Sequence, residues 1–442
     1  MSRRRFLATA AAWPLAWAAG RASLAVEAQA PATSANPSAA TPASAAAKAS
    51  LHAPTRYAFV ADRFSYAISV VEIDTGRHVD TLSFGFRPRV FEMARDDAML
   101  AVGSPEVPAI CLHNLQTRQT HRLALPSPLY QIFFVPQTRL LAIGMRDQVG
   151  LIDYERLSLT VLARRFDSPR RETALNTYYS LLFSSFSQTF WVLDELRPSL
   201  WRQPGPASAA ASGASGAFSW RENWQQSWQE AWQEIDLAAH VPGGSGLGIG
   251  VASAEDALLA LTVDDGSQGL LYFPQTGRVC STGPMRRSGH TNEPLLMPYI
   301  DAASAHVLFG DVQGHMALFG LDDEAARSGQ REVRPERFVL DFSPRVIRSG
   351  WLDSTWIIGG DRALQLQSFA DPADRKQFRF REAVTGIWVT GDSKTALVTL
   401  DEGPSRLYRY DIRTREPLAP IFVPHVAMPG LVRMGSNNSI CY

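Results

Sequence analysis

From residue 56 to the end of the chain, short apolar runs alternate with turns built from Gly, Pro, Asp and Ser. The runs have the length of β-strands and are rich in Val, Ile, Leu and Phe, as buried strands are. No long helical period interrupts them outside one insertion. Many short strands at regular spacing are typical of a sandwich, a barrel or a propeller, and the spacing decides among these three.

One hairpin pattern occurs six times along this region. In each copy an apolar run ends near an acidic residue, and after a short turn a second apolar run follows. The acidic residues at these junctions are Asp62, Asp147, Asp264 with Asp265, Asp311, Asp361 and Asp401. Asp tolerates turn dihedrals and bonds the backbone two residues on, so turn formation is the simplest role for them. Recurrence of one hairpin indicates a repeat architecture.

The apolar run that opens each unit starts near residues 88, 129, 176, 247, 294, 345 and 384. Most of these starts are about 40 to 50 residues apart, the length of a four-stranded propeller blade. An eighth opening run, residues 430–434, would complete the unit whose other strands lie within residues 57–84. The sequence therefore predicts an all-β fold, an eight-bladed β-propeller of four-stranded blades, closed by strands from both ends. A seven-bladed ring is the alternative if residues 429–435 pair elsewhere.

The first unit carries a family resemblance. Its features are Phe59-Val60-Ala61-Asp62, the run from Ala67 to Thr75-Gly76, Arg87-Pro88, and Asp96-Asp97. These resemble the YVTN-type propeller repeat, although Ala98 stands where that repeat has Gly. Eight-bladed relatives include the haem-d-binding domain of periplasmic nitrite reductase and the NirF-like maturation proteins. Seven-bladed relatives include the heavy chains of quinone-bearing amine dehydrogenases. The resemblance implies the fold and a link to redox cofactors, and no motif selects one relative.

The N-terminus predicts export. Ser2-Arg3-Arg4-Arg5-Phe6-Leu7, followed by a short Ala-rich apolar stretch, matches the twin-arginine signal pattern. We therefore predict a signal peptide over residues 1–28, a disordered Ala/Pro/Ser linker over 29–55, and the propeller over 56–442. Twin-arginine export delivers proteins that are already folded to the periplasm, and such cargo often loads a cofactor first.

Composition narrows the function classes. The formal net charge is +0, so nothing favours nucleic-acid binding. No run of 18 or more apolar residues occurs, which predicts no transmembrane span in the mature chain. The three cysteines, Cys111, Cys280 and Cys441, are too few for a disulfide framework and fit no zinc or haem-attachment spacing. No nucleophile motif, phosphate loop or dinucleotide fingerprint appears, so catalytic residues stay unknown.

The cations cluster on the connections between predicted blades. Arginine binds carboxylates and phosphates through two parallel hydrogen bonds, so such a cluster favours an anionic ligand. A haem-type tetrapyrrole with several carboxylates would fit it. The predicted cofactor-binding arginines are Arg87, Arg89, Arg170, Arg171, Arg286, Arg287 and Arg345. The alternative is that arginine is simply the common cation of this chain, since loops are polar and only three lysines occur.

His290 is the candidate metal ligand. It lies in the polar, glycine-bearing sequence Ser-Gly-His-Thr-Asn-Glu-Pro, on the face where the ligand is expected. We predict that it serves as an axial ligand of the cofactor or handles a proton. A structural hydrogen bond is the alternative for a single histidine. His-Glu-x-x-His is absent, which argues against a catalytic zinc.

An insertion over residues 197–246 carries a tryptophan-rich helix. Trp220, Trp224, Trp228 and Trp232 recur at i, i+4 spacing after a capping-box sequence, so they share one side of the predicted helix. Such a stripe must be covered. We predict a binding surface for a periplasmic partner protein, with packing on its own blade or contact with a membrane interface as alternatives.

These observations predict an exported binding or maturation factor for a redox cofactor or its partner enzyme, rather than a self-sufficient enzyme. Two alternatives stay open. The chain could be the propeller subunit of a periplasmic oxidoreductase, or an interaction scaffold that holds no cofactor.

Overall fold

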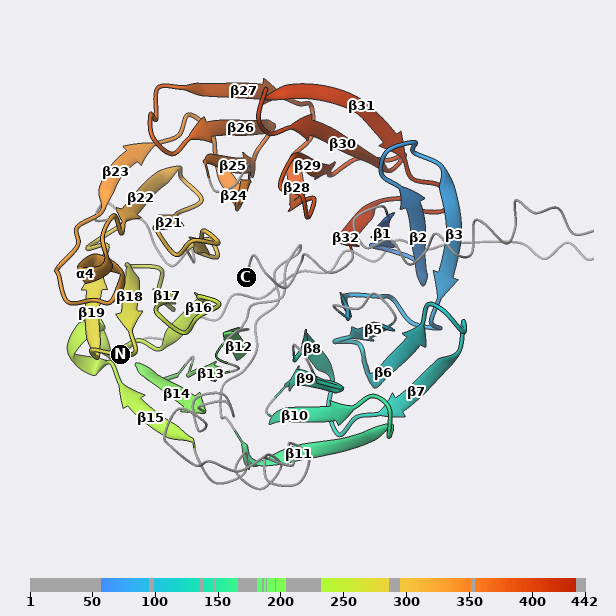
Figure 1. The fold of residues 1–442 in the computed structure, drawn as a ribbon, viewed down its shortest axis with the longest axis horizontal. Coiled ribbons are helices and arrows are strands. Elements are labelled where there is room, and N and C mark those ends of the chain that lie inside the picture. The colour runs from blue at the N-terminus through green and yellow to red at the C-terminus, as the bar shows by residue number, and fades with distance from the viewer. Residues whose placement is uncertain are drawn as a thin grey trace, which may run out of the picture. The chain divides into compact units, whose positions relative to one another are not determined.

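The chain forms a ring of eight four-stranded antiparallel sheets, as a computed structural model shows (Figure 1). The structure describes residues 57–94, 99–135, 138–146, 148–165, 181–184, 187, 189–194, 196–203, 232–285, 295–350 and 354–434. All of them belong to one compact unit, residues 46–442. The eight-bladed β-propeller predicted from the sequence is therefore confirmed, and the seven-bladed alternative is excluded.

Each blade is numbered from its inner strand outward. Blade 1 consists of β32 (Pro429–Met434), β1 (Tyr57–Asp62), β2 (Ala67–Glu72) and β3 (His78–Ser83). Blade 2 consists of β4 (Val90–Met93), β5 (Met99–Ser104), β6 (Val107–Asn114) and β7 (Thr120–Ala124). Blade 3 consists of β8 (Leu129–Phe134), β9 (Leu140–Met145), β10 (Gln148–Asp153) and β11 (Ser158–Arg165). Blade 4 consists of β12 (Leu181–Ser184), β13 (Thr189–Leu193), β14 (Ser199–Gln203) and β15 (Gln233–Asp236).

The second half repeats the plan. Blade 5 consists of β16 (Leu247–Ala252), β17 (Leu259–Val263), β18 (Gly269–Phe273) and β19 (Arg278–Ser281). Blade 6 consists of β20 (Tyr299–Ile300), β21 (His306–Gly310), β22 (His315–Gly320) and β23 (Glu336–Val339). Blade 7 consists of β24 (Pro344–Gly350), β25 (Thr355–Gly360), β26 (Ala363–Ser368) and β27 (Arg375–Arg379). Blade 8 consists of β28 (Val384–Val389), β29 (Thr395–Leu400), β30 (Arg406–Asp411) and β31 (Glu416–Phe422).

Helices are minor in the described part of the chain. They are the short helix α4 (Glu324–Arg327) and the 3-10 turns η2 (Ala238–His240) and η3 (Pro242–Gly244). Asp323 caps α4 by accepting a hydrogen bond from the Ala326 backbone N–H. Among the described residues, none of the helices has the length and hydrophobicity that a membrane crossing requires.

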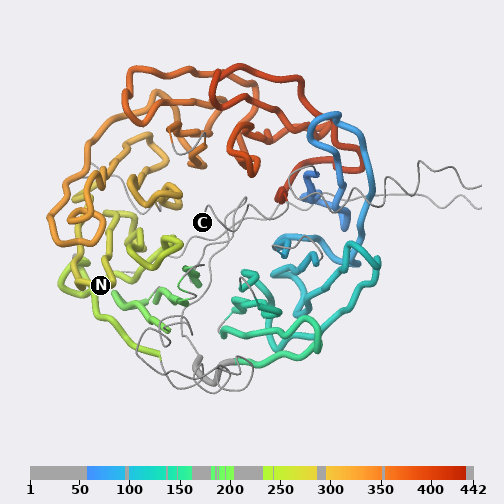
Figure 2. The backbone as a smooth tube through the Cα atoms, viewed as in Figure 1, coloured from blue at the N-terminus to red at the C-terminus, as the bar shows by residue number. Residues whose placement is uncertain are grey.

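Strands from opposite ends of the chain close the ring. β32 pairs antiparallel with β1, and the register places Val432 opposite Val60 and Met434 opposite Ala58. The backbone tube brings these red and blue segments together (Figure 2). Closure removes the free inner edge that β1 would otherwise expose, which protects the sheet from pairing with other chains. The predicted eighth opening strand is thus in its expected place.

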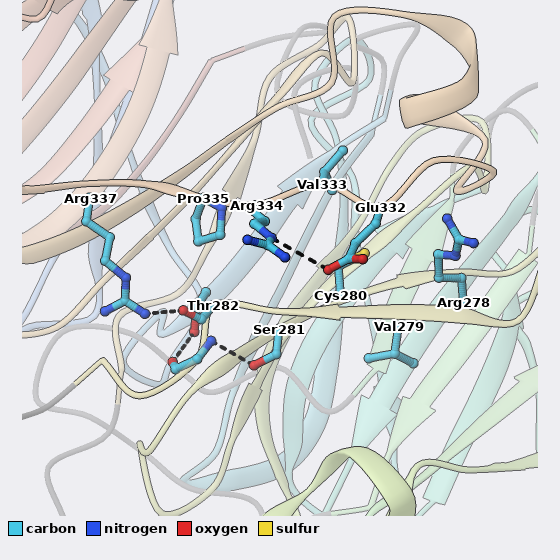
Figure 3. A pocket seen from close by; sticks show the side chains of 11 residues that line it. Arg278, Val279, Cys280, Ser281, Thr282, Glu332, Val333, Arg334, Pro335 and Arg337 are labelled. Atoms are coloured by element: carbon cyan, nitrogen blue, oxygen red, sulfur yellow. Dashed lines mark hydrogen bonds and ion pairs between the residues drawn. The ribbon is translucent and has the colours of Figure 1, made fainter.

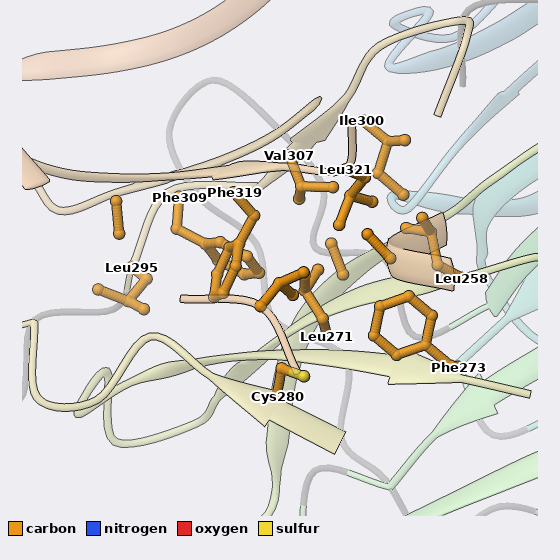
Figure 4. Close-up of a cluster of buried hydrophobic side chains, with 14 of the residues drawn as sticks. Leu258, Leu271, Phe273, Cys280, Leu295, Ile300, Val307, Phe309, Phe319 and Leu321 are labelled. Carbon is orange, nitrogen blue, oxygen red and sulfur yellow. The ribbon is translucent and has the colours of Figure 1, made fainter. Parts of the chain in front are cut away.

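The core lies between blades rather than at the centre of the ring. The described residues form eight clusters of buried apolar side chains, and each cluster combines residues from two neighbouring blades. Figure 4 shows the cluster between blades 5 and 6, where Phe273 and Leu271 meet Phe309 and Phe319. The middle strands are buried on both faces, which is why they are continuous apolar runs without polar alternation.

The described part of the predicted insertion, 197–246, contains blade structure. β14 and β15 pair with each other in blade 4, with Trp201 opposite Glu234. Because β14 and β15 belong to the blade, the insertion itself comprises only the residues between these two strands. Residues 204–231 lie outside the described residues, as do residues 1–56, on which the predicted signal peptide and linker fall.

Candidate ligand-binding face

One face of the ring gathers the turns on which the sequence placed its candidate residues. In a four-stranded antiparallel blade, the hairpin between the second and third strands emerges on the same side as the connection to the next blade. We call this side the entry face. The described aspartates of the repeat lie on its hairpins, for example Asp62 at the end of β1 and Asp311 after β21.

Three of these aspartates, Asp62, Asp265 and Asp311, make the turn bonds that the simplest interpretation of the repeat predicted. Asp62 Oδ1 accepts a hydrogen bond from Phe64 N at 2.8 Å, and Asp265 Oδ1 accepts one from Ser267 N at 2.8 Å. Both are bonds to the backbone two residues on, the geometry of an Asx turn. Asp62 also accepts a bond from Ala427 N at 2.9 Å through its second oxygen, so it ties the first hairpin to the closing connection.

The described candidate arginines carry acidic partners on the entry face. Arg87 Nε lies 3.0 Å from a carboxylate oxygen of Glu106, and Arg89 Nε lies 3.9 Å from the other oxygen. Arg345 Nη2 lies 2.6 Å from Asp361 Oδ1. These arginine side chains are 34–40% exposed. An exposed ion pair contributes about 0–1 kcal/mol, so an incoming carboxylate can replace the acidic partner at small cost.

A further ion pair links the two blades that meet at the ring closure. Arg63, in the first hairpin of blade 1, donates to Asp401 Oδ1 of blade 8 at 2.8 Å. With the pairs of blades 2 and 7, it forms an arc of alternating charges over four consecutive blades. The same hairpin presents two aromatic side chains to solvent, Phe64 at 60% and Tyr66 at 55% exposure. Sequence reasoning missed Arg63 and both aromatic rings.

Several predicted residues lie outside the described residues. They are Arg170, Arg171, Arg286, Arg287, His290, Trp220, Trp224 and Trp228. Trp232 is described, directly before β15. Its side chain is half-buried and packs against the apolar cluster between blades 3 and 4. This contact is the packing that the alternative interpretation of the tryptophan stripe predicted for one of its four members.

A histidine held by a buried carboxylate lies on the entry face. His315 begins β22, and its Nδ1 donates to Asp311 Oδ2 at 2.8 Å. Asp311 is fully buried, and its other oxygen accepts the backbone N–H groups of Gln313 and His315 at 2.9 Å. The His315 side chain is 35% exposed. A carboxylate on Nδ1 fixes the ring and directs Nε2 to a ligand, as in metal-binding histidines.

The same arrangement recurs on the opposite face of blade 6. His306 Nδ1 donates to Asp301 Oδ2 at 2.7 Å, and Asp301 Oδ1 accepts the His306 backbone N–H at 3.1 Å. Here the ring packs edge-on against Phe369, with a centroid separation of 4.7 Å. The spacing Asp-x-x-x-His at Asp311 and Asp-x-x-x-x-His at Asp301 is the signal that could have found both pairs in the sequence.

Charged side chains also join the inner strands. Arg433 on β32 donates to Glu92 on β4 at 2.9 Å, and both side chains are about 15% exposed. Burial raises the pKa of Glu92, and the charge and hydrogen bond of Arg433 act against that rise. On β24, the Arg348 guanidinium lies 5.8 Å from the centre of the buried Tyr299 ring on β20. Among the described residues, the strands nearest the ring axis therefore carry Arg433, Arg348 and Glu92, in addition to Arg345 near the start of β24.

The described residues hold no group of three or more His, Cys, Asp or Glu side chains placed to bind a metal ion. Cys111 and Cys280 are buried free thiols, and burial raises the pKa of Cys111 while the nearby Arg122 lowers it.

Comparisons with known proteins identify the fold. No family model and no curated protein sequence matches the chain. Among solved structures, the dihydro-haem d1 dehydrogenase NirN in complex with DHE is similar, with a TM-score of 0.61 and 14% identity, covering 88% of this chain and 76% of NirN. Apo AztD from Citrobacter koseri is similar with a TM-score of 0.51 and 10% identity, covering 85% of this chain and 96% of AztD. At these identities the likeness concerns the propeller fold.

Proposed function

We propose that the protein is an exported propeller that binds an anionic tetrapyrrole-type cofactor, or its precursor, on the entry face and transfers it to a partner enzyme. The composition of the entry face is the main support for this proposal. It combines exposed arginines in exchangeable ion pairs with a carboxylate-held histidine, His315. NirN, which shares the fold, is known in complex with DHE, which adds support from analogy alone.

The described residues fit the edge of such a ligand. Arg87, Arg89 and Arg345 would bind its carboxylates, because a guanidinium donates two parallel hydrogen bonds to a carboxylate. Phe64 and Tyr66, exposed on the hairpin of blade 1, offer ring faces for stacking against a flat macrocycle. The ligand would bring the redox chemistry, while this chain binds and orients it.

His315 and His290 are the candidates for an axial ligand. His290, predicted from its loop sequence, lies outside the described residues. His315 has the orientation that a ligand needs, because Asp311 fixes Nδ1 and leaves Nε2 directed away from the carboxylate. Substituting each histidine separately distinguishes them, and His306→Ala is the matched control because its own Asp pair lies on the opposite face.

The test starts with the visible absorption spectrum of the protein purified from its native host. A bound tetrapyrrole gives a strong band, and titration of the purified protein with an iron tetrapyrrole follows the same band. We expect Arg345→Glu to weaken binding by about tenfold or more, the value of one charge-assisted bond of about 1.5–3 kcal/mol. A colourless protein that also fails to bind the added tetrapyrrole would exclude cofactor handling and leave the interaction scaffold.

We propose export to the periplasm by the twin-arginine route, from Ser2-Arg3-Arg4-Arg5-Phe6-Leu7. Replacement of Arg3 and Arg4 by lysine in the full chain should leave the protein in the cytoplasmic fraction, while the unchanged chain reaches the periplasm. Equal periplasmic amounts of both forms would refute this route. The predicted partner protein is tested by recovering proteins from periplasmic extract, once with the unchanged chain and once with a variant in which all four stripe tryptophans are replaced.

A further inference from the structure

A groove with two extended walls lies on the outer rim between blades 5 and 6 (Figure 3). One wall is the outer strand β19 with the residues that follow it, 278–283. The other is the segment 332–337, which includes the start of β23. The cavity between the walls has a volume of about 580 Å³. It is separate from the entry-face residues described above.

The β19 wall presents a free strand edge. β19 is the last strand in the order β16-β17-β18-β19. Thr282 N donates to Gly269 O at 2.9 Å, and Cys280 pairs with Leu271. Hydrogen-bonded residues alternate along an antiparallel pair, so Cys280 and Arg278 direct their backbone groups toward β18. The N–H and C=O groups of Val279 and Ser281 therefore point away from the sheet.

The opposite wall does not take up this edge. Within the described parts of both walls, no backbone hydrogen bond joins residues 278–281 to residues 332–336. The walls are joined at one end by the Arg337 side chain, which donates to the carbonyl oxygens of Thr282 and of Pro284. Arg337 thus fixes one end of the groove, and no described residue forms backbone hydrogen bonds to the outer edge of β19.

Side chains give the groove a positive charge. Three arginines, Arg278, Arg334 and Arg337, face one acidic residue, Glu332. Arg334 is 88% exposed and lies 3.8 Å from Glu332, a weak pair. Arg278 and Cys280 share one side of β19, and Cys280 packs in the cluster toward blade 6, so Arg278 projects on the groove side. Its Nη1 atom is buried and has no hydrogen-bond partner within the described structure.

We propose that this groove binds an extended acidic segment of a partner protein, which adds to β19 as a fifth strand of blade 5. The exposed N–H and C=O groups of Val279 and Ser281 supply the main-chain pairing of strand addition. Arg278 and Arg334 select carboxylates at alternate positions of the added strand, because alternate side chains lie on the same side of it. This interaction is independent of the proposed cofactor.

The test uses the full chain and blocked, fluorescently labelled peptides of about eight residues in which glutamate and valine alternate, the length of an ordinary strand. Fluorescence anisotropy should show saturable binding. Two further peptides carry methyl groups on alternate backbone nitrogens, one on the odd positions and one on the even positions. The peptide whose methyl groups remove the N–H groups that pair with β19 should bind about tenfold more weakly. A peptide with lysine in place of glutamate should not bind.

Two charge reversals locate the site. Arg278→Glu and Arg334→Glu should each weaken binding of the acidic peptide by about tenfold. Arg375→Glu is the matched control, because Arg375 is the first residue of β27, the outer strand of blade 7, as Arg278 is of β19. Unfolding midpoints of the three variants identify any variant that fails to fold. If Arg278→Glu fails to fold, Arg334→Glu still tests the proposal, because Arg334 is largely exposed.

Three outcomes would overturn the proposal. The first is the absence of saturable binding by the acidic peptide. The second is a loss in Arg375→Glu equal to that in the groove variants, which would indicate general charge attraction. The third is undiminished binding of both methylated peptides, together with displacement by inorganic phosphate at the peptide's own concentration, which would indicate a simple anion site without strand addition.

Discussion

Glu92 on the inner strand of blade 2 accepts a hydrogen bond of 2.9 Å from Arg433 on β32, the strand that closes the ring. The two residues are 341 positions apart in the chain. The pair joins the closing blade to its neighbour beside the ring axis. This ion pair beside the ring axis can therefore form only when β32 closes the ring.

Removing the cation from this pair should destabilise the fold. Arg433→Ala leaves a largely buried carboxylate without its charge partner, and we expect a loss of about 2–4 kcal/mol in the free energy of unfolding. Urea unfolding at about pH 7 measures it. The double variant Arg433→Ala with Glu92→Gln should recover part of the loss, since a neutral amide tolerates burial better. Equal stability of the single and double variants would contradict a charge effect.

The raised pKa of Glu92 predicts a pH dependence. A carboxyl group whose pKa is higher in the folded state binds a proton more readily there, so its contribution favours folding at low pH and is lost as the pH rises through the folded-state pKa. Between about pH 7 and pH 5, the native protein should therefore gain stability relative to Glu92→Gln, which cannot titrate. Urea midpoints of both proteins at the two pH values test this, and a difference that is the same at both would contradict it.

Ring closure should depend on the apolar pairing of β32. Val432 is fully buried, lies opposite Val60 and packs in the cluster between blades 8 and 1. Val432→Ala removes two methyl groups and leaves a cavity, with an expected cost of about 2 kcal/mol. Leu418→Ala, on the outer strand β31 at 39% exposure, should cost much less. Equal losses in denaturant unfolding would contradict a special role for the closing strand.

Asp256 should be critical for the contact between blades 4 and 5. Its Oδ1 accepts the indole N–H of the fully buried Trp191 at 2.8 Å, and its Oδ2 accepts Arg202 Nη2 at 2.7 Å. Asp256→Ala leaves the indole donor buried and unsatisfied, with an expected cost of about 2–3 kcal/mol. Asp371→Ala, which removes an exposed bond to Ala373 N, is the control and should change stability little. Comparable effects of both would contradict this assignment.

A close backbone approach at the entry face explains Gly360, the last residue of β25. A Cβ atom at this position would lie 2.0 Å from the carbonyl oxygen of Ser343. Backbone cannot move aside as a flexible side chain can, so Gly360→Ala should shift the hairpin that carries Asp361 and lower stability by about 2 kcal/mol or more. Gly85→Ala, with no atom within 4 Å, tests conformational strain alone, and an equal loss there would contradict the steric explanation.

The sequence alone determined the architecture of the propeller. The hairpins from Asp62 to Asp401, the opening runs and the closing run at 430–434 are all local patterns, because the middle strands of a blade are buried on both faces and each turn needs residues that tolerate its dihedrals. Where the pattern is weak, prediction was less accurate. The first strand of blade 6 consists of only Tyr299–Ile300 and begins later than the predicted residue 294.

The candidate site required the tertiary structure. Whether Arg87, Arg89 and Arg345 have acidic partners depends on how the turns fold back, and the Arg63–Asp401 and Glu92–Arg433 pairs join residues more than 300 positions apart. Such pairings leave no periodic signal in a sequence, because the side chains meet only when the ring closes. The alternation of apolar runs and turns encodes each blade locally, whereas the charges that face one another across blades are brought together by closure of the ring.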